Sequence, residues 1–531
     1  MTALIPLVVT LPLLGAAIAL ILGRHRRAQI MVTIATLSAV LVISSILLAL
    51  VMNSDTGGSA VYVGGWEPPW GIVLVVDPLA ALMLVVTSIT LLGVLLFSVG
   101  QGVIDGNRET PVTIFHPTYL ILSAGILNAF VAGDLFNLYV GFEILLAASY
   151  VLITLGGTAP RIRAGTIYVV VSLVSSMFFL SAIGLLYGAT GTVNMAQLSI
   201  RLAELPTDVQ LVLHVVLLLG FGIKAAVFPL SFWLPDSYPT APAPVTAVFA
   251  GLLTKVGVYA LIRTETLLFP GNTLHGVLLI VALLTLVVGI LGAVAQADIK
   301  RMLSFTLVSH IGYLVFGIAL GTPAGYAATI FYVIHHITVQ TTLFLTTGLI
   351  ERVGGTTSIL RLGGLLKASP LLALLYFLPA MNLGGIPPFT GFLGKVGLFR
   401  AGTELATEQS SWLIWAVIAA GAATSLLTLY AVARVWNLAF WRRQDEVPGY
   451  ESPLIDQLQE DPDDTGHIRT RHSPPLMVFA TAGMVVVGLA LTVGAGPLYD
   501  ASVHAAKAIV APATYIATVY RDSSFTEEGP R

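Results

Sequence analysis

The sequence predicts an all-α polytopic membrane protein with about fourteen transmembrane helices. Of its 531 residues, 56% are hydrophobic and only 10% are charged, and the mean hydropathy is +0.91. A soluble globular protein is roughly 25% charged, so this chain lacks the polar surface that it would need in water. Apolar runs of about 20 residues, the length that crosses a bilayer, recur almost end to end. The runs are continuous rather than alternating, which excludes a transmembrane barrel.

The composition also excludes several classes of function. The absence of cysteine rules out disulfides, thiol catalysis and cysteine-bound iron–sulfur or haem groups, and we expect no cofactor and no bound metal. The net charge of −2 gives no information about nucleic acid, and no basic stretch is long enough to suggest a nucleic-acid partner, so we expect none. The first apolar run has no basic segment before it, so we expect it to remain in the lipid bilayer as a span.

The predicted spans follow one another along most of the chain. Each is an apolar run of spanning length. Their cores are residues 3–23, 29–52, 74–99, 113–132, 134–155, 161–188, 209–232, 243–268, 273–296, 302–320, 325–350, 369–401, 412–440 and 475–497.

Lysine and arginine are distributed unequally between the two sets of loops. Excess positive charge marks the cytoplasmic side, so the odd-numbered loops are predicted to face the cytoplasm and both termini to lie outside. The predicted cytoplasmic residues are Arg24, Arg26, Arg27, Arg108, Arg161, Arg163, Lys300, Arg301, Arg352, Arg361, Lys367, Arg442, Arg443, Arg469 and Arg471, against Arg201, Arg263 and Arg400 on the opposite side.

This topology divides the chain into five parts. Residues 1–112 hold three spans, residues 441–474 form a cytoplasmic loop, and residues 475–531 hold the last span and a tail. The tail after residue 500 is predicted to be a short interfacial helix or a frayed terminus. Between these parts lie two five-helix blocks, 113–268 and 273–440. Each has an odd number of spans, so the second is an inverted repeat of the first.

Four charged residues are predicted to lie deep in the membrane: Glu143, Lys224, Lys255 and Lys395. A charged side chain at the centre of a transmembrane helix costs about 2.5–3.5 kcal/mol on insertion scales. Each of these four residues must therefore be paired, be hydrated or have a function in transport. One alternative is a structural ion pair that locks helices together, although one glutamate cannot neutralise three lysines. Burial disfavours the ammonium form of lysine and a nearby carboxylate favours it, so a lysine whose partner changes can release a proton. Glu143 and Lys224 are the natural candidates for such a pair.

Histidines extend this polar set. His310 shares a helix face with Thr306 and Tyr313. His336 lines up with Tyr332 and Gln340 at four-residue spacing, and His335 is its neighbour. A buried histidine is often only structural, and we assign that role to His214, which has no polar stripe. For His310 and His336, with His335, Gln340 and Tyr332 as possible members, the stripes favour a proton relay.

Two of the lysine-bearing helices are interrupted. Pro229 and the Pro-rich run to Pro244 follow Lys224, and Gly384-Gly-Ile-Pro-Pro388 precedes Lys395. Proline inside a helix removes a backbone hydrogen bond and clashes with the preceding turn. Broken helices at corresponding positions in two halves mark a transport site, so helices 7 and 12 are predicted to be broken. An ordinary proline kink remains an alternative for Pro229.

Four motifs in the sequence resemble those of a known family. Gly133-Asp-Leu-Phe-Asn-Leu-Tyr-Val-Gly-Phe-Glu143 and Phe221-Gly-Ile-Lys-Ala-Ala-Val-Phe-Pro-Leu230 resemble motifs of the D subunits of Mrp-type sodium/proton antiporters. Asp298-Ile-Lys-Arg301 and Gly385-Ile-Pro-Pro-Phe-Thr-Gly-Phe392 resemble the wider superfamily shared with the proton-pumping membrane subunits of complex I. The resemblance covers roughly residues 70–440.

The resemblance implies a proton-translocating subunit of a multisubunit monovalent-cation (Na+)/proton antiporter in the bacterial inner membrane, with the other Mrp subunits as partners. It is then a secondary transporter subunit and not an enzyme. The implied proton-transfer residues are Glu143, Lys224, Lys255, His310, His336 and Lys395. Relatives commonly carry a lysine where this chain has Gln340, so either water and His336 bridge this step or the proton route is shorter here.

Two alternatives remain open: a proton-pumping membrane subunit of complex I or a membrane hydrogenase, and a non-transporting membrane scaffold. Sodium prefers several oxygen ligands, and Glu143 is the only carboxylate expected deep in the spans. Asp77 and Asp134 are interpreted as interfacial aspartates at span ends. We therefore expect the sodium route in a partner subunit or at an interface.

Overall fold

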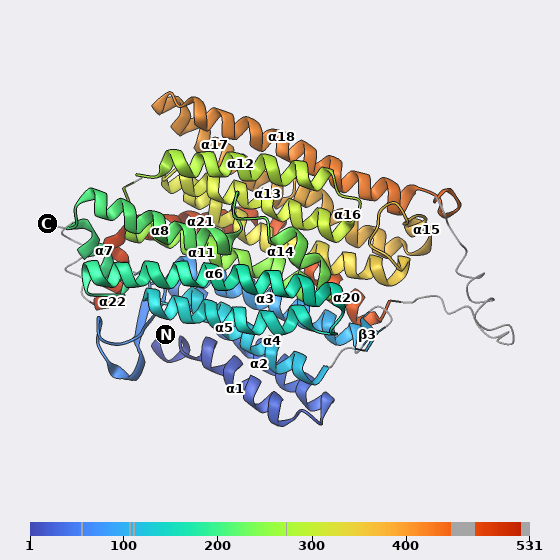
Figure 1. Cartoon of the computed structure of the whole chain (residues 1–531), viewed down its shortest axis with the longest axis horizontal. Coiled ribbons are helices and arrows are strands. Elements are labelled where there is room, and N and C mark those ends of the chain that lie inside the picture. The colour runs from blue at the N-terminus through green and yellow to red at the C-terminus, as the bar shows by residue number, and fades with distance from the viewer. Residues whose placement is uncertain are drawn as a thin grey trace.

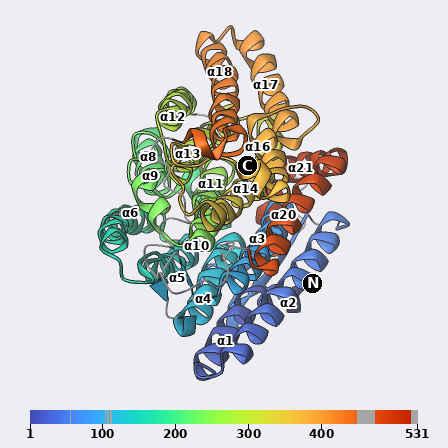
Figure 2. The same ribbon diagram turned by 90° about the vertical axis from the view of Figure 1, so that its right-hand side faces the viewer.

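The chain folds into a bundle of helices that run along one common long axis (Figure 1). The computed structural model describes residues 1–54, 57–102, 104–105, 108–109, 112–271, 273–447 and 473–521. The amino terminus and the last described helix lie at the same end of the bundle, as the even number of predicted spans requires. Figure 2 shows α14 near the centre, with α1 and α2 at one edge and α17 and α18 at the other.

The helices account for nearly all of the described structure. Those of about 15 residues or more are α1 (Leu7–Ile21), α2 (Arg26–Met52), α3 (Pro78–Gln101), α4 (Val112–Val131), α5 (Leu135–Thr154), α6 (Ala159–Thr190), α8 (Thr207–Ala225), α12 (His275–Val294), α13 (Ile299–Ala319), α14 (Pro323–Gly354), α16 (Pro370–Gly384), α17 (Thr390–Gln409), α18 (Trp412–Val435), α20 (Pro475–Val493) and α21 (Ala495–Val510). The shorter ones are α7 (Met195–Ala203), α9 (Leu234–Ser237), α10 (Ala243–Val248), α11 (Thr254–Arg263), α15 (Leu365–Ala368) and α22 (Pro512–Tyr520).

Other elements are small. Two antiparallel pairs, β1 (Ser59–Tyr62) with β2 (Val73–Val76) and β3 (Ile104–Asp105) with β4 (Arg108–Glu109), lie between spans. Three π-helical segments interrupt or extend the helices: η4 (Phe249–Leu253), η5 (Thr264–Leu268) and η6 (Trp436–Trp441). Single 3₁₀ turns are η1 (Thr2–Leu4), η2 (Val63–Gly65), η3 (Tyr238–Thr240) and η7 (Gln444–Glu446).

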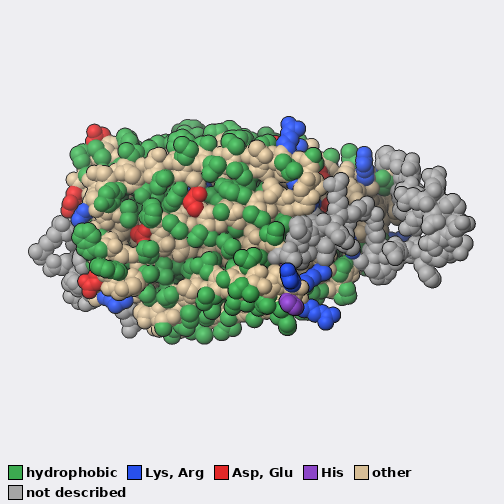
Figure 3. Space-filling model, turned by 60° about the horizontal axis from the view of Figure 1, so that its bottom comes forward, with side chains coloured by type: hydrophobic (Ala, Val, Ile, Leu, Met, Phe, Trp, Pro, Cys, Tyr) green, Lys and Arg blue, Asp and Glu red, His purple; other side chains and the backbone are tan. Residues whose placement is uncertain are grey.

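The predicted fold class is confirmed. In the described part of the chain, 13 helices are long and apolar enough to cross a membrane, and they coincide with 13 of the predicted spans. The remaining one, 369–401, is divided into α16 and α17. In the view of Figure 3, hydrophobic side chains cover the middle of the bundle and Lys and Arg side chains gather mostly toward one end. The five predicted parts of the chain and the inverted repeats stay predictions.

Both expected breaks are found. The span predicted as 209–232 ends at Ala225, and turns lead from there to α9. The span predicted as 369–401 is interrupted between Gly384 and Thr390. The prolines of these segments cannot continue a helical hydrogen-bond ladder, so the helix stops there. The breaks leave free backbone carbonyls inside the bundle.

The ends of two spans differ from prediction. The span predicted to begin at residue 74 starts only at Pro78, because Val73–Val76 pairs with β1 and the Asp77 side chain caps the helix by accepting from Ala80 N at 2.9 Å. The last span ends at Val493, and α21 and α22 follow it with buried faces. A frayed terminus is therefore wrong as far as residue 521. Most of the predicted loop 441–474 lies outside the described residues.

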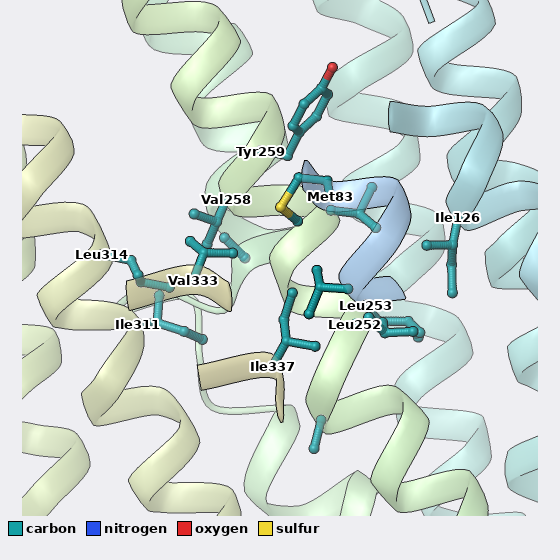
Figure 4. Close-up of a cluster of buried hydrophobic side chains, with 14 of the residues drawn as sticks. Met83, Ile126, Leu252, Leu253, Val258, Tyr259, Ile311, Leu314, Val333 and Ile337 are labelled. Carbon is teal, nitrogen blue, oxygen red and sulfur yellow. The ribbon is translucent and has the colours of Figure 1, made fainter. Parts of the chain in front are cut away.

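The core packs tightly around the central helices (Figure 4). Met83 of α3, Leu252 of η4, Val258 of α11, Ile311 of α13 and Ile337 of α14 are all buried there. Each of these elements either carries one of the predicted polar residues or packs directly against a helix that does. Apolar packing excludes bulk water from that region, so a charge within it interacts strongly with its neighbours.

Candidate functional site

Lys224 lies one residue before the end of α8, beside the first break. The helix ends because Ala226 adopts a left-handed conformation with φ 57° and ψ 48°. Gly257 of α11 packs against this end so closely that a Cβ atom there would lie 2.6 Å from the Ala225 nitrogen. Two lysine-bearing helices are thereby held in direct contact at the level of Lys224.

Ser176 of α6 joins Lys224 to Glu143. The Lys224 ammonium donates to the Ser176 hydroxyl at 3.2 Å, and that hydroxyl donates in turn to Glu143 Oε1 through a short hydrogen bond. The ammonium also lies 4.9 Å from the centre of the Phe142 ring. Among the described residues, no direct ion pair forms between Glu143 and Lys224. The predicted pair is therefore a three-residue chain.

Sequence reasoning missed Ser176, although a signal was present. Tyr168, Ser172, Ser175 and Ser176 recur at three- and four-residue spacing on an otherwise apolar span, which predicts one polar helix face. The first three of these side chains line a small, mostly apolar cavity of about 20 Å³ that Lys224 also borders. A cavity of this volume has room for about one water molecule, which the hydroxyl groups could hold beside the ammonium group.

Lys255 is fully buried, and within the described part of the chain its ammonium bonds only to the backbone. Its ammonium donates to the carbonyl of Ala250 at 2.7 Å. Ala250 lies in the π-helical segment η4, and such segments displace carbonyls from the regular ladder. Gly251 of the same segment lies directly against Thr341 of α14. Within the described ranges, no direct hydrogen bond connects Lys255 with Lys224 or with a histidine.

Lys395 of α17 reaches back into the second break. It donates to the carbonyls of Leu383 at 3.1 Å and Gly384 at 3.3 Å, and to the hydroxyl of Ser425 at 2.9 Å. It also lies 5.4 Å from the centre of the Tyr313 ring. Carbonyls freed by the break thus solvate this ammonium, as expected for non-helical backbone that lines a polar site.

His310 is the centre of a stacked aromatic group. Its Nδ1 pairs with the Tyr332 hydroxyl at 2.9 Å and its Nε2 with Thr428 at 3.4 Å. The rings of His310 and His336 stack with centroids 5.1 Å apart, and Tyr313 meets His310 edge-on. The structure therefore brings the two predicted histidines together and places them beside the ring that contacts Lys395.

His335 belongs to a neighbouring network at the start of α17. Its Nδ1 pairs with the Thr390 hydroxyl at 2.9 Å. The amide oxygen of Asn382 accepts from Thr390 at 3.3 Å and from Gly391 N at 2.9 Å. This network fixes α17 against α14 and α16. Thr390 and Asn382 were not predicted, because neither lies on a polar stripe.

Several buried polar atoms of the central helix α14 have no hydrogen-bond partner among the described residues. They include both ring nitrogens of His336, Nε2 of His335 and Oε1 of Gln340, while the Gln340 amide donates to the carbonyl of Leu303 at 2.8 Å. A buried polar atom left unpaired costs about 1–3 kcal/mol, so such atoms are places where internal water binds. The position of Gln340 is thus polar and able to hold water, although the glutamine itself cannot titrate.

Two sequence interpretations near the end of the bundle that holds α7 are wrong. Asp77 is not an ordinary interfacial aspartate, since it is buried and ion-paired with Arg263 at 2.6 Å. Arg263 lies within α11 and not in a loop. A further buried carboxylate, Glu265, lies in η5 near the end of its span and pairs with His214 at 2.6 Å. Asp134 is also buried, and it caps α5 by accepting from Asn137 N.

Comparison with known proteins agrees with this geometry. A family model described as NADH:quinone oxidoreductase/Mrp antiporter, transmembrane, matches residues 132–428. The D subunit of the Na(+)/H(+) antiporter of Alkalihalophilus pseudofirmus is 36% identical over an aligned length of 529 residues, and the match covers 98% of this chain and 100% of the relative. A chain in the structure of the Mrp complex from Dietzia sp. DQ12-45-1b has a TM-score of 0.86 and 32% identity, and the match covers 98% of this chain and 100% of that one.

The alternative relationship is more distant. A chain of respiratory complex I from Thermus thermophilus has a TM-score of 0.71 over 93% of this chain and 98% of its own length, with 22% identity. That likeness shows a shared fold alone. The match to the antiporter D subunit, by contrast, runs almost the whole length of both chains. From its extent it follows that this multi-pass membrane protein belongs to the D-subunit family of Mrp-type sodium/proton antiporters.

Proposed function

We propose that this chain carries protons for a multisubunit sodium/proton antiporter of the bacterial inner membrane, through Glu143, Lys224, Lys255, His336, His310 and Lys395. The names of the relatives support a transporter rather than an enzyme. The other subunits of an Mrp-type complex are its partners, and both termini lie outside the cell. The observation that carries the proposal is the chain Lys224–Ser176–Glu143.

That three-residue chain permits proton transfer without a large movement. Ser176 accepts from the Lys224 ammonium and donates to the Glu143 carboxylate. If the serine passes its proton to the carboxylate and receives one from the ammonium, the result is a neutral amine and a neutral acid. Lys224 is buried and Glu143 is half-buried, so these hydrogen bonds are stronger than they would be in bulk water. Their order, from ammonium to serine to carboxylate, sets the direction of transfer.

The second five-helix block, residues 273–440, contains groups that can receive the proton. The stacked rings of His310 and His336 lie between the central helices, and Tyr313 contacts both His310 and Lys395. Imidazole can accept a proton on one nitrogen and release it from the other. The unpaired nitrogens of His336 are suited to water that would bridge this cluster with Lys255.

The proposal is tested in everted membrane vesicles that contain the complete complex. Glu143→Gln and Lys224→Ala should each nearly abolish sodium-dependent proton movement, because each removes a titratable end of the three-residue chain. Lys367→Ala, at an exposed lysine of α15, is the matched control and should exchange normally. Co-purification of the partner subunits shows that each variant assembles. Normal exchange by either assembled variant would refute the proposal.

We assign the sodium route to a partner subunit or to an interface. In the described residues, no three His, Asp or Glu side chains gather into a possible cation site. Asp77, Glu265 and Glu143 are each engaged by another side chain. A row of lysines also repels cations. The test is to express this chain alone in antiporter-deficient cells, where robust sodium/proton exchange would contradict this assignment.

A further inference from the structure

His214 and Glu265 form a buried ionisable pair that the path through the lysines and histidines does not use. Their nearest atoms, His214 Nε2 and Glu265 Oε1, are 2.6 Å apart. Both residues are at most 7% exposed. The ring of Phe269 stacks on the imidazole with centroids 4.4 Å apart and an interplanar angle of 8°. A buried titratable pair in a membrane protein is a candidate functional site.

The pair lies on the same two spans as Lys224 and Lys255. His214 lies on α8, ten residues before Lys224, and Glu265 lies ten residues after Lys255. At 1.5 Å per residue, each group is displaced about 15 Å along its helix from its lysine. The two helices run in opposite directions and contact each other where Gly257 meets Ala225, so both displacements point the same way. The helices that hold Lys224 and Lys255 therefore meet again at a second titratable layer.

The backbone of the span that carries Lys255 and Glu265 is irregular beside both of these residues. Lys255 follows the π-helical segment η4, and Glu265 lies inside the π-helical segment η5. π-Helical segments inside α-helices occur frequently at functional sites, because they change the direction of one side chain and free backbone groups. On this helix, each of the two titratable groups is therefore accompanied by such a segment.

We propose that His214 and Glu265 form an outward-side proton site, which exchanges protons between the Lys224–Lys255 layer and the outer face of the membrane. This inference rests on the proposed function. The layer lies toward the end of the bundle that holds α7 and α22, which is the outer end in the predicted orientation (Figure 1). A proton that arrives binds to the Glu265 carboxylate or to the His214 imidazole, and its release on the outer side restores the starting state of the pair.

The charged and titratable groups around the pair do not neutralise Glu265. Tyr326 of α14 is within electrostatic range of Glu265. From α7, Arg201 is engaged with the carbonyl of Thr190. Arg263 of α11 is held by Asp77. The basic groups of α21 are His504 and Lys507, both exposed. None of these cations pairs with Glu265, so within the described structure His214 is the side chain that pairs with it.

The test uses everted vesicles with the whole complex, whose lumen faces the outer side of the protein. Lumenal and external pH are set independently, and the initial rate of sodium-dependent proton movement is recorded. Glu265→Gln keeps the hydrogen bond to His214 but cannot titrate. It should lower the rate about tenfold or more and remove the dependence on lumenal pH, while the dependence on external pH persists. Glu265→Asp should restore the lumenal dependence.

Two further variants separate a proton role from a structural one. Thr266→Val removes a buried hydroxyl of the same segment and should behave like the wild type. His214→Gln retains a donor toward Glu265 and should reproduce the effect of Glu265→Gln, which provides a second test if one variant assembles poorly. Wild-type rates and lumenal pH dependence in assembled Glu265→Gln would overturn this inference. Absence of exchange in the wild-type complex would instead refute the proposed function.

Discussion

The two lysines beside the broken helices have similar surroundings but different partners. Lys224 and Lys395 each lie at a break and each donate to a serine of a neighbouring helix. Ser176 donates its own hydrogen to the Glu143 carboxylate. Ser425 donates its hydrogen to the carbonyl of Gly384 at 2.9 Å. The first lysine is thus linked to a base, whereas the second is held only by dipoles.

This difference assigns the two sites different tasks. A carboxylate can take the proton that a lysine gives up, so at the first site a proton can pass from Lys224 to Glu143. A backbone carbonyl cannot be protonated at physiological pH, so Lys395 must exchange its proton with water or with the histidine cluster. The serines also come from different positions in the two predicted repeats: Ser176 lies on the third helix of its block and Ser425 on the fifth.

The largest effect is expected from Lys395→Arg. Arginine keeps the positive charge but scarcely releases a proton. Exchange should therefore fall by about tenfold or more, almost as far as in Lys395→Ala. The measurement is the initial rate of sodium-dependent proton movement in everted vesicles, compared at equal amounts of assembled complex. Full activity of the arginine variant would mean that a fixed charge is sufficient at the second break.

The two serines provide the sharpest comparison. Ser176→Ala removes the hydroxyl that links Lys224 to Glu143, and exchange should fall about tenfold. Ser425→Ala leaves two carbonyls for Lys395, so the loss should be about two- to threefold, the effect of one ordinary hydrogen bond. Ser176→Thr, which restores a hydroxyl, should recover most of the activity. Equal losses in the two alanine variants would show that both serines act only as packing or hydrogen-bonding groups.

The fold was predictable because apolar runs determine spans almost independently of tertiary contacts. The residue types of the site were also predictable, since charges such as Lys255 stand out against hydrocarbon. What could not be predicted is which groups meet. Ser176 and Ser425 look ordinary in an apolar helix, and only the packing of neighbouring helices brings them to the lysines. The same holds for Glu265, which the sequence places near a span end while its partner His214 lies 51 residues earlier.

A smaller effect is expected at the turn that holds Lys395. Gly385 has φ +83°, and a Cβ atom there would lie 2.9 Å from the Lys395 ammonium nitrogen. Gly385→Ala should cost about 1–2 kcal/mol of stability through the left-handed backbone and should displace the ammonium group from its carbonyls. The melting temperature in detergent and the exchange rate should both fall. Gly384→Ala is the control, because its Cβ would come closest to the flexible end of Leu429, at 3.2 Å. Equal behaviour of the two variants would contradict this expectation.

The smallest effect is expected at the corresponding position of the first break. Ala226 adopts the left-handed conformation with φ 57°, although it is not glycine and is fully buried. Ala226→Gly relieves strain of about 1–2 kcal/mol, but it also removes a buried methyl group worth about 0.8 kcal/mol and increases the entropy of the unfolded chain by about 0.4–1 kcal/mol.

These contributions nearly cancel, so Ala226→Gly should melt within a few degrees of the wild type and exchange protons normally. Ala226→Val keeps a side chain and adds β-branching, which is strongly disfavoured at positive φ, and it should melt clearly lower. Strain is often retained at sites where it contributes to function. If Ala226→Gly assembled and melted normally but lost exchange, the strained turn itself would take part in transport. The first break would then differ from the second in its backbone as well as in its carboxylate.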